Sequence, residues 1–382
     1  MAGVMAGVAL PRAPGPAAPG PAATTPGAAL PVRVMVCDDS AVIRSILCRV
    51  LGGDTGIEIV ARACNGQEAL DQIRRKPDLA DVLVLDIEMP QMDGLTALPL
   101  LLEASPGLKV VIASTLTTRG AATTLEAMRL GAVDYVPKPS AAALSGDLSF
   151  QRELLGKVRG LGRRRTAAAA AAAPRALALR TGPALRPRLL AIGSSTGGPQ
   201  ALTALLQALR TELGAAGLGV PAVLTQHMPP AFTPLLAEQL TRLGGLPCTE
   251  ARDGEMLRPG RVHIAPGGRH LLVVQGPSGL QAKLDDGPPE NFCRPSVDPM
   301  LRSAVKACDG KVLMLMLTGM GHDGLTGTEA LVAAGGLAMA QDEASSVVWG
   351  MPGAIAKAGL CSAVLPLPAL AARAAVLLRG AA

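Results

Sequence analysis

The second half of the chain carries a serine, a histidine and an aspartate, each following an apolar run typical of a buried strand. Ser195 stands in Gly-Ser-Ser-Thr-Gly after RLLAI, and this Gly-x-Ser-x-Gly spacing is typical of a nucleophile on a sharp strand-to-helix turn. His227 follows PAVLTQ, and Asp323 stands in the loop after KVLMLMLTG. The carboxyl ends of parallel strands meet at one sheet edge. The pattern therefore predicts a nucleophile, a general base and an orienting carboxylate at that edge.

The serine motif alone leaves a second interpretation open. Glycine- and serine-rich turns between a strand and a helix also bind phosphate groups, including those of dinucleotides. The glycines at 193, 197 and 198 miss the Gly-x-Gly-x-x-Gly spacing of dinucleotide sites, and no clear ribose-binding acid follows about twenty residues later. Acyl transfer by Ser195 is the interpretation that we carry forward.

Four histidines compete for the role of base. His227 follows a predicted strand at the same sheet edge as Ser195, whereas His322 stands directly beside Asp323 and is a rival to it. We expect His263, inside the run RVHIAP, to be a structural histidine. His270 lies in the charged turn GGRH, where we expect it to face water.

The first half of the chain carries acids at strand ends. Asp38 and Asp39 follow VRVMVC, and Asp86 follows DVLVL. Converging carboxylates are hard oxygen ligands for Mg²⁺, and one of them can accept a phosphoryl group. Ser114 after KVVIA and Lys138 after VDYVP add a hydroxyl and a cation for phosphoryl oxygens at the same edge.

The elements that position these residues alternate between short apolar runs and helical patterns in both halves. This alternation predicts an α/β fold with two doubly wound parallel-sheet domains. We expect a disordered Ala/Pro/Gly tail over residues 1–30, a first domain over 31–150, a basic Ala/Pro/Arg linker over 151–186 and a second domain over 187–382.

Composition limits the function classes. The net charge of +6 comes from the linker region, which holds no aromatic stacking residues after Phe150, so we expect no nucleic-acid binding. Seven cysteines without a Cys-x-x-Cys pair argue against disulfides and zinc sites. Prolines interrupt the apolar N-terminal stretch, and no apolar run reaches membrane-spanning length. We therefore expect a cytoplasmic protein.

The motifs CDDS, LDIEMPQMDG, VIAST and PKP resemble the receiver domain of bacterial response regulators, a flavodoxin-like fold, over residues 31–150. The resemblance implies that a histidine kinase of the chemotaxis type phosphorylates one aspartate beside Mg²⁺. The implied site comprises the acceptor Asp86, the Mg²⁺ ligands Asp38, Asp39, Asp86 and Glu88 (through its carbonyl), and the phosphoryl-sensing residues Ser114, Lys138 and Tyr135.

The motifs AIGSSTGGPQAL, TQHMPPAFTPLLAEQL, RPSVDPMLRSA, LTGMGHDG and QDEASSVVWGMP resemble the chemotaxis protein-glutamate methylesterase family (CheB type), with a Rossmann-like catalytic domain. The resemblance implies that Ser195, His227 and Asp323 form the catalytic triad, and it assigns the oxyanion hole to the backbone N–H groups of Thr196 and Met320. His322 then falls at a variable position of its motif.

The same resemblance implies what the enzyme acts on. The expected reactions are hydrolysis of glutamyl methyl esters and deamidation of glutamines on methyl-accepting chemotaxis receptors. No cofactor is expected in the catalytic domain. The protein is expected to be a monomer that meets the membrane only through its receptors. The receiver domain is expected to cover the catalytic edge until it is phosphorylated. A DNA-binding response regulator and a non-catalytic scaffold remain the alternatives.

Overall fold

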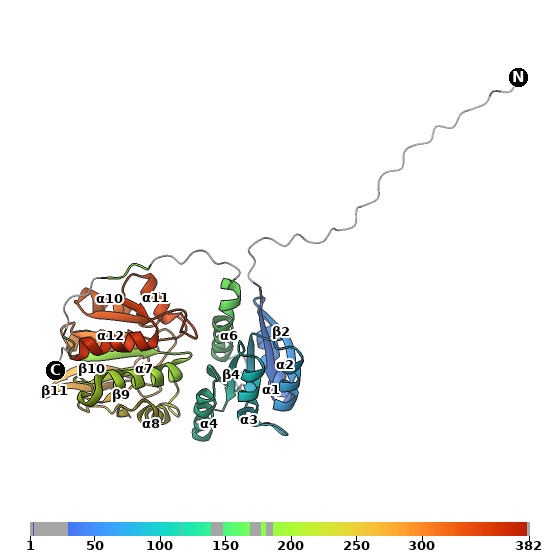
Figure 1. Cartoon of the computed structure of the whole chain (residues 1–382), viewed down its shortest axis with the longest axis horizontal. Helices are drawn as coiled ribbons and strands as arrows, with labels where there is room; N and C mark the ends of the chain where they lie inside the picture. Colours follow the sequence, from blue (N-terminus) through green and yellow to red (C-terminus); the bar gives the residue numbers. More distant parts are fainter. Residues whose placement is uncertain are drawn as a thin grey trace.

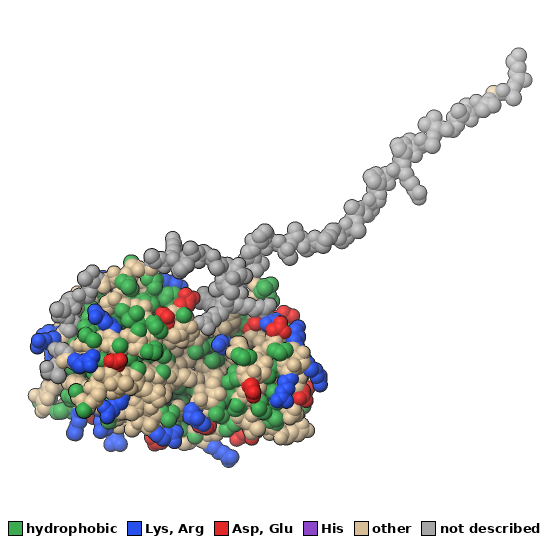
Figure 2. Space-filling model, viewed as in Figure 1, with side chains coloured by type: hydrophobic (Ala, Val, Ile, Leu, Met, Phe, Trp, Pro, Cys, Tyr) green, Lys and Arg blue, Asp and Glu red, His purple; other side chains and the backbone are tan. Residues whose placement is uncertain are grey.

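The computed structural model describes residues 3, 30–115, 117–138, 148–168, 177–180 and 186–379. The expected tail over 1–30 lies outside these ranges except at Gly3 and Leu30. Two α/β parts stand side by side (Figure 1). On the face seen in Figure 2, Lys and Arg side chains are scattered among hydrophobic and acidic ones over both parts. None of the described helices is long and apolar enough to cross a membrane.

The first part is built on a five-stranded parallel sheet in the order β2-β1-β3-β4-β5, as expected for a flavodoxin-like fold. Its central strands are fully buried because helices cover both faces, which explains their continuous apolar runs. The strands are β1 Val32–Cys37, β2 Ile57–Ala63, β3 Val82–Asp86, β4 Lys109–Ser114 and β5 Asp134–Pro137, and the helices are α1 Ala41–Gly52, α2 Gly66–Arg75, α3 Gly94–Ala104 and α4 Thr118–Arg129.

A further helix, α6 (Leu148–Ala168), occupies the segment in which the expected linker begins. Its apolar face is buried against the five-stranded sheet through Phe150, Leu154, Val158 and Leu161. The prediction that the linker starts at residue 151 is therefore wrong. The many arginines and alanines of this segment are typical of a linker. Its apolar residues recur at helical spacing, however, and they form a packed face. In Figure 1, α6 lies between the two parts.

The second part is built on a seven-stranded parallel sheet in the order β14-β13-β12-β6-β7-β9-β8. This part begins at the central strand β6. Strands β7, β8 and β9 then form one side of the sheet, and β12, β13 and β14 form the other side. The strands are β6 Leu189–Ser194, β7 Ala222–Gln226, β8 Cys248–Glu250, β9 Val262–Ile264, β12 Val312–Met316, β13 Leu337–Gln341 and β14 Ala363–Leu365. The order reverses between β6 and β12, and ligands bind at the carboxyl edge beside such a reversal.

The helices of the second part pack on both faces of this sheet; they are α7 Gly198–Leu213, α8 Thr233–Gly244, α9 Val297–Ala307, α10 Leu325–Ala333, α11 Met351–Lys357 and α12 Leu367–Arg379, with a short 3₁₀ turn, η1, at Gly214–Ala216. The run LLVVQ, expected in the alternating α/β pattern, instead forms an antiparallel hairpin. Its strands β10 (His270–Gly276) and β11 (Gly279–Asp285) form a two-stranded sheet, and β10 packs against α9.

Candidate active site

The three predicted hydrolytic residues meet at the carboxyl edge of the seven-stranded sheet. Ser195 follows β6, His227 follows β7 and Asp323 follows β12, so adjacent strands deliver all three. Nε2 of His227 lies 2.7 Å from Oδ2 of Asp323. Ser195 and His227 line the same pocket, which has a volume of about 800 Å³. The structure therefore brings the three together at one edge, as their positions after predicted strands indicated.

The backbone around Ser195 is held by its neighbours. The Ser195 N–H donates to the Thr318 carbonyl (3.0 Å), and the Gln226 side chain donates to the Ser195 carbonyl (3.0 Å). Gly197 begins α7 at φ +76°, a conformation that favours glycine, and a Cβ there would lie 2.6 Å from Val347. The glycine in this motif thus allows the tight turn that presents the serine.

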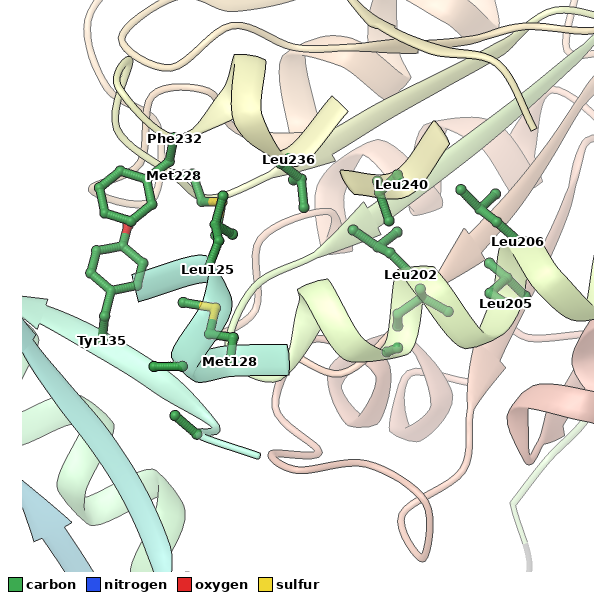
Figure 3. Packing of buried hydrophobic residues seen from close by; sticks show 14 of the residues in the cluster. Leu125, Met128, Tyr135, Leu202, Leu205, Leu206, Met228, Phe232, Leu236 and Leu240 are labelled. Atoms are coloured by element: carbon green, nitrogen blue, oxygen red, sulfur yellow. The ribbon is translucent and has the colours of Figure 1, made fainter. Parts of the chain in front are cut away.

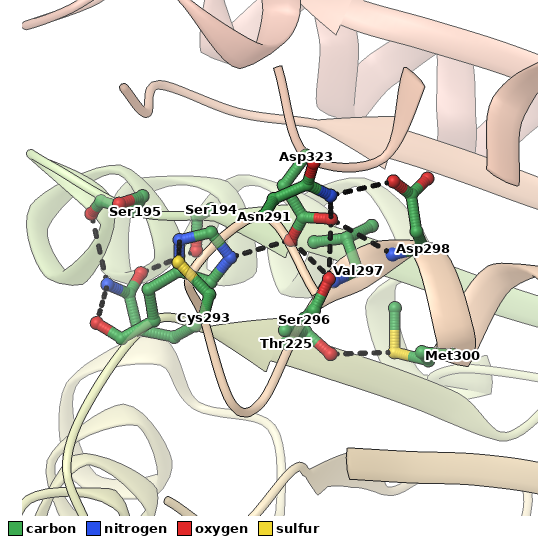
Figure 4. Close-up of polar contacts among 12 residues, drawn as sticks. Ser194, Ser195, Thr225, Asn291, Cys293, Ser296, Val297, Asp298, Met300 and Asp323 are labelled. Atoms are coloured by element: carbon green, nitrogen blue, oxygen red, sulfur yellow. Dashed lines mark hydrogen bonds and ion pairs between the residues drawn. The ribbon is translucent and has the colours of Figure 1, made fainter. Parts of the chain in front are cut away.

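Asp323 is a buried carboxylate with five hydrogen-bond donors around it. Oδ1 accepts from Asn291 Nδ2 (3.0 Å), Ser296 Oγ (2.6 Å) and the Asp298 N–H (3.2 Å). Oδ2 accepts from His227 and from the Val297 N–H (2.6 Å). Figure 4 shows this convergence on Asp323. Burial alone raises the pKa of this carboxyl, but the donors and the charge of His227 outweigh burial and lower it.

The sequence did not identify Asn291 and Ser296 as hydrogen-bond donors to the Asp323 carboxylate. Ser296 is the residue before α9 within the motif RPSVDP, where a serine is typical of a helix N-cap. Here its hydroxyl is donated to Asp323 rather than used to cap its own helix. The serine of this motif is the sequence feature that could have indicated a polar role here. Its partner, Asp323, is evident only from the fold.

The neighbours of His227 shift its protonation equilibrium toward the imidazolium. Burial lowers its pKa, but the neighbouring Cys293 and Asp323 outweigh burial and raise the pKa to about 10. Nε2 is bonded to Asp323, which leaves Nδ1 as the other ring nitrogen. Nδ1 lies 3.3 Å from the Cys293 sulfur. Cys293, which the sequence did not single out for chemistry, therefore contacts the base.

The other three histidines differ from His227 in their burial and in their contacts. His263 is buried with Nδ1 2.6 Å from Glu255, a structural role that agrees with expectation. His322 is exposed at the rim of the pocket. The expectation that His270 faces water is wrong, because it is buried at the start of β10. Its two ring nitrogens contact the Pro288 carbonyl (3.0 Å) and the Ser296 N–H (3.2 Å), and these contacts fix the loop before α9.

The acids of the first part form a second cluster. Carboxylate oxygens of Asp38, Asp39 and Asp86 lie within 4.8 Å of one another. Lys138 Nζ lies 2.7 Å from Asp86 Oδ2 and 4.0 Å from Asp38 Oδ2. Burial and the charge of Asp86 raise the pKa of Asp38 to about 6, and burial raises the pKa of Asp86 against the opposing effect of Lys138. Asp38 Oδ2 is buried without a hydrogen-bond partner, an arrangement that is costly for a carboxylate.

The other residues expected at this cluster, Glu88, Ser114 and Tyr135, differ in their exposure and in their contacts. Glu88 is exposed just after Asp86, and its N–H lies 3.4 Å from Asp86 Oδ1. Ser114 accepts a hydrogen bond from Thr124 of α4 (2.6 Å) and donates to the Thr115 carbonyl (3.1 Å). Tyr135 is buried, and its ring faces the second part of the chain.

An aromatic stack joins the two parts. The rings of Tyr135 and Phe232 are nearly parallel, with centroids 4.6 Å apart. Leu125 and Met128 of α4 lie beside the stack, close to Met228, as Figure 3 shows. Stacked aromatic pairs contribute about 0.5–1.5 kcal/mol beyond their buried area. This apolar contact ties the end of β5 to the loop that follows His227.

Polar contacts reinforce the same interface. Thr196 donates its hydroxyl to Asp134, and Lys157 of α6 also contacts Asp134 (3.1 Å). Gln200 of α7 donates to the carbonyls of Met128 (2.8 Å) and Ala132. Asp134 therefore links helix α6 to the residue directly after the candidate nucleophile. The charged partners on either side stabilise Lys157 as a cation, and its pKa is raised although burial opposes this.

Helix α6 forms one wall of the pocket. Arg152 lies over the ring of Phe292 at 4.6 Å, and Phe292 is itself 81% exposed. Gly156 and Gly160 face Met320, and a Cβ on Gly156 would lie 3.1 Å from its terminal methyl carbon. The pocket that holds Ser195 is thus lined by both parts.

Known proteins resemble the chain over most of its length. Residues 190–374 match the family model described as CheB methylesterase, and residues 34–145 match the response regulator receiver domain. A protein-glutamate methylesterase/protein-glutamine glutaminase of Paramagnetospirillum magneticum is 50% identical over 365 residues, covering 89% of this chain and 94% of the relative. One of the same name from Azospirillum brasilense is 52% identical over 362 residues, covering 88% and 90%.

A solved structure is also similar to the second part. The crystal structure of the Thermotoga maritima CheB methylesterase catalytic domain is 36% identical, with a TM-score of 0.47, and covers 50% of this chain and 98% of that one.

Proposed function

The chain belongs to the CheB methylesterase family, and we propose that it is a phosphorylation-activated hydrolase of methylated chemoreceptors. It removes methyl esters from receptor glutamates and deamidates receptor glutamines during chemotaxis adaptation. The observation that carries the proposal is His227, fixed by Asp323 at the carboxyl edge in one pocket with Ser195. That arrangement is the one that acyl transfer by a serine requires.

The reaction proceeds in two steps. In its neutral form, His227 takes the proton of Ser195 at Nδ1, and the Ser195 oxygen attacks the glutamyl carbonyl carbon. The tetrahedral intermediate collapses, the carbon–oxygen or carbon–nitrogen bond breaks, and methanol or ammonia leaves with the proton from His227. Water then attacks the glutamyl-Ser195 ester, which frees the glutamate and restores the serine.

We assign the oxyanion hole to the backbone N–H groups of Thr196 and Met320. Two neighbouring N–H groups are excluded because the Ser195 N–H donates to Thr318 and the Gly319 N–H donates to the Val348 carbonyl (3.0 Å). Removing one donor from such a hole costs roughly 2.7–4 kcal/mol of transition-state stabilisation. The positions of the two loops therefore matter as much as the triad.

The first part of the chain acts as the receiver, with Asp86 as the proposed phosphoryl acceptor. The acids fit a divalent cation, because three carboxylates converge there and one oxygen of Asp38 is buried without a partner. Asp38, Asp39, Asp86 and the Glu88 carbonyl would hold Mg²⁺, which supplies charge neutralisation for the incoming phosphoryl group. Lys138, already 2.7 Å from Asp86, contributes the matching cation from the protein.

Replacing Asp86 by Asn is expected to uncouple phosphorylation from hydrolysis. Wild-type protein given acetyl phosphate and Mg²⁺ should release methanol from methylated receptor membranes about tenfold faster than untreated protein, a shift of roughly 1.4 kcal/mol. The Asp86→Asn variant should show no such gain, and EDTA should abolish it in the wild type. Asp78→Asn, at an exposed receiver aspartate, is the matched control and should respond like the wild type. Equal rates for treated wild type and Asp86→Asn would exclude this regulation.

We propose that the unphosphorylated receiver restrains the enzyme through the interface between the two parts. A helix with its side chains is about 10–12 Å across, and α6 lines the pocket that a helical receptor segment has to reach. We infer that the receiver must move for the substrate to bind. Each contact across the interface then favours the closed state and lowers the basal rate.

Gln200→Ala should raise the basal rate without phosphorylation. Gln200 donates two hydrogen bonds to receiver carbonyls, each worth about 0.5–1.5 kcal/mol net, so their loss shifts the closed–open equilibrium roughly tenfold. Gln207→Ala is the matched control, because Gln207 lies on the same helix but donates to Leu243 within the catalytic part (2.9 Å). The measurement is methanol release in the absence of phosphodonor. An unchanged rate for Gln200→Ala would mean that these contacts do not restrain the enzyme.

The partners follow from this function. The phosphodonor is a histidine kinase of the chemotaxis type, and the substrates are methyl-accepting receptors. We place the enzyme in the cytoplasm as a monomer, in contact with the membrane only through those receptors.

A further inference from the structure

A cysteine thiol shares the histidine of the active site. Sγ of Cys293 lies 3.3 Å from Nδ1 of His227, whose Nε2 lies 2.7 Å from Asp323. Cys293 is only partly buried and lines the same pocket as Ser195. Thiol, imidazole and carboxylate in this sequence of contacts form the arrangement that activates cysteine nucleophiles. The site therefore holds two nucleophiles around one base.

The loop that carries this thiol is firmly held. The backbones of Glu290 and Cys293 exchange two hydrogen bonds of 3.1 and 2.9 Å. The Asn291 side chain bridges Asp323 and Asp298, at 3.0 and 2.9 Å. Asn291 and Phe292 both adopt positive φ, at 51° and 63°, which is costly for residues other than glycine. Such a conformation persists only where the surroundings enforce it, so the thiol is fixed at the histidine.

The local charges favour a reactive thiol. The groups that face His227 are the Asp323 carboxylate and the Cys293 sulfur, and both raise its pKa. An imidazolium held by Asp323 on one side presents positive charge to the sulfur on the other. Cysteines beside such a cation are the ones that react as thiolates with peroxides and alkylating agents.

The other cysteines provide a contrast within the same chain. All seven are free, and Cys37, Cys48, Cys248, Cys308 and Cys361 are buried. Cys64 is exposed, but its thiol donates to Glu68 (3.0 Å), and this hydrogen bond to the carboxylate raises its pKa. Solutes can reach Cys64 and Cys293. The Cys64 thiol is hydrogen-bonded to a carboxylate, whereas the Cys293 sulfur contacts the His227 ring. Accessibility alone therefore predicts modification of Cys64, whereas the local chemistry predicts Cys293.

We propose that Cys293 is an oxidant-sensitive modification site, at which a peroxide switches the hydrolase off. The thiolate sulfur attacks one peroxide oxygen, the O–O bond breaks, and the sulfur is oxidised to a sulfenic acid. The departing hydroxide takes the proton of His227 and leaves as water. The new S–OH group lies at Nδ1, the nitrogen that Ser195 needs. A thiol reductant reverses the step, forming its own disulfide and water.

The test uses the full-length reduced protein, hydrogen peroxide and dimedone, a trap for sulfenic acids. Mass spectrometry should locate the dimedone adduct at Cys293 and leave Cys64 unmodified. In a parallel sample without dimedone, methanol release should fall at least tenfold relative to the untreated protein and return with dithiothreitol. Each variant is compared with its own untreated rate. Cys64→Ala should remain peroxide-sensitive, whereas Cys293→Ala and Cys293→Ser should lose the sensitivity.

Two results would overturn the proposal: an adduct at Cys64 with Cys293 unmodified, or equal peroxide inactivation of wild type and both Cys293 variants. The loss of activity rests on the proposed function, but adduct mapping does not. An untreated protein that released no methanol would count against the methylesterase assignment, and the position of the adduct would still decide which thiol is reactive. Circular dichroism of the variants separates a lost thiol from a lost fold.

Discussion

Ser195→Ala should reduce methylester hydrolysis by roughly 10⁵–10⁶-fold, because the remaining residues have no nucleophile in its position. The substitution removes one oxygen from a residue whose structural contacts are made by its backbone. The Ser195 N–H still bonds to Thr318 and its carbonyl still accepts from Gln226 and from the Gly198 N–H (2.7 Å). We therefore expect the fold and its thermal stability to be unchanged.

The measurement is methanol release from methylated receptor membranes in the presence of acetyl phosphate. Ser362→Ala, which removes a partly buried serine hydroxyl bonded to Ala338 (3.1 Å), is the matched control and should keep its activity. Phosphorylation of Asp86 in Ser195→Ala reports that the chain is folded. If Ser195→Ala kept wild-type activity, the serine mechanism would have to be abandoned.

Asp323→Asn is expected to reduce activity by roughly 10⁴-fold, since an amide cannot hold the histidine in the required tautomer. The structure adds a second cost. Both carboxylate oxygens accept hydrogen bonds, three at Oδ1 and two at Oδ2. The amide NH₂ group therefore faces donors in either orientation. Leaving such buried donors unpaired costs about 1–3 kcal/mol each, so thermal stability should also fall.

Asp309→Asn is the control for Asp323→Asn, because its side chain is 81% exposed and pairs only loosely with Arg188, at 3.5 Å. Activity and thermal unfolding of both variants are measured under identical conditions. An Asp323→Asn protein as active as Asp309→Asn would remove Asp323 from the mechanism, whatever its stability.

Much of this architecture could be predicted because the strands are short and apolar, and because the candidate catalytic residues lie in the loops that follow them. RLLAI, PAVLTQ and KVLMLMLTG became adjacent strands, so the side chains after them converge, as parallel topology requires. The acids at Asp38 and Asp86 followed the same logic in the receiver.

Other features depend on contacts that no periodicity encodes. Asn291 and Ser296 reach Asp323 across 32 and 27 residues of sequence, and His270 supports the loop between them from β10. The apolar face of α6 was not predicted, because the basic residues that follow it are typical of a linker. Nothing in the sequence pairs Tyr135 with Phe232, and only the docking of two domains makes them partners.

The position of β12 has a consequence for how the enzyme becomes active during synthesis. β12 inserts between β6 and β13, in the middle of the sheet, although it is formed more than a hundred residues after β6. A nascent chain that has already emerged past Ser195 and His227 still lacks the strand that carries Asp323. A ribosome-stalled or truncated chain that ends before β12 therefore cannot hydrolyse receptor esters, even when its receiver has folded and is ready to accept a phosphoryl group.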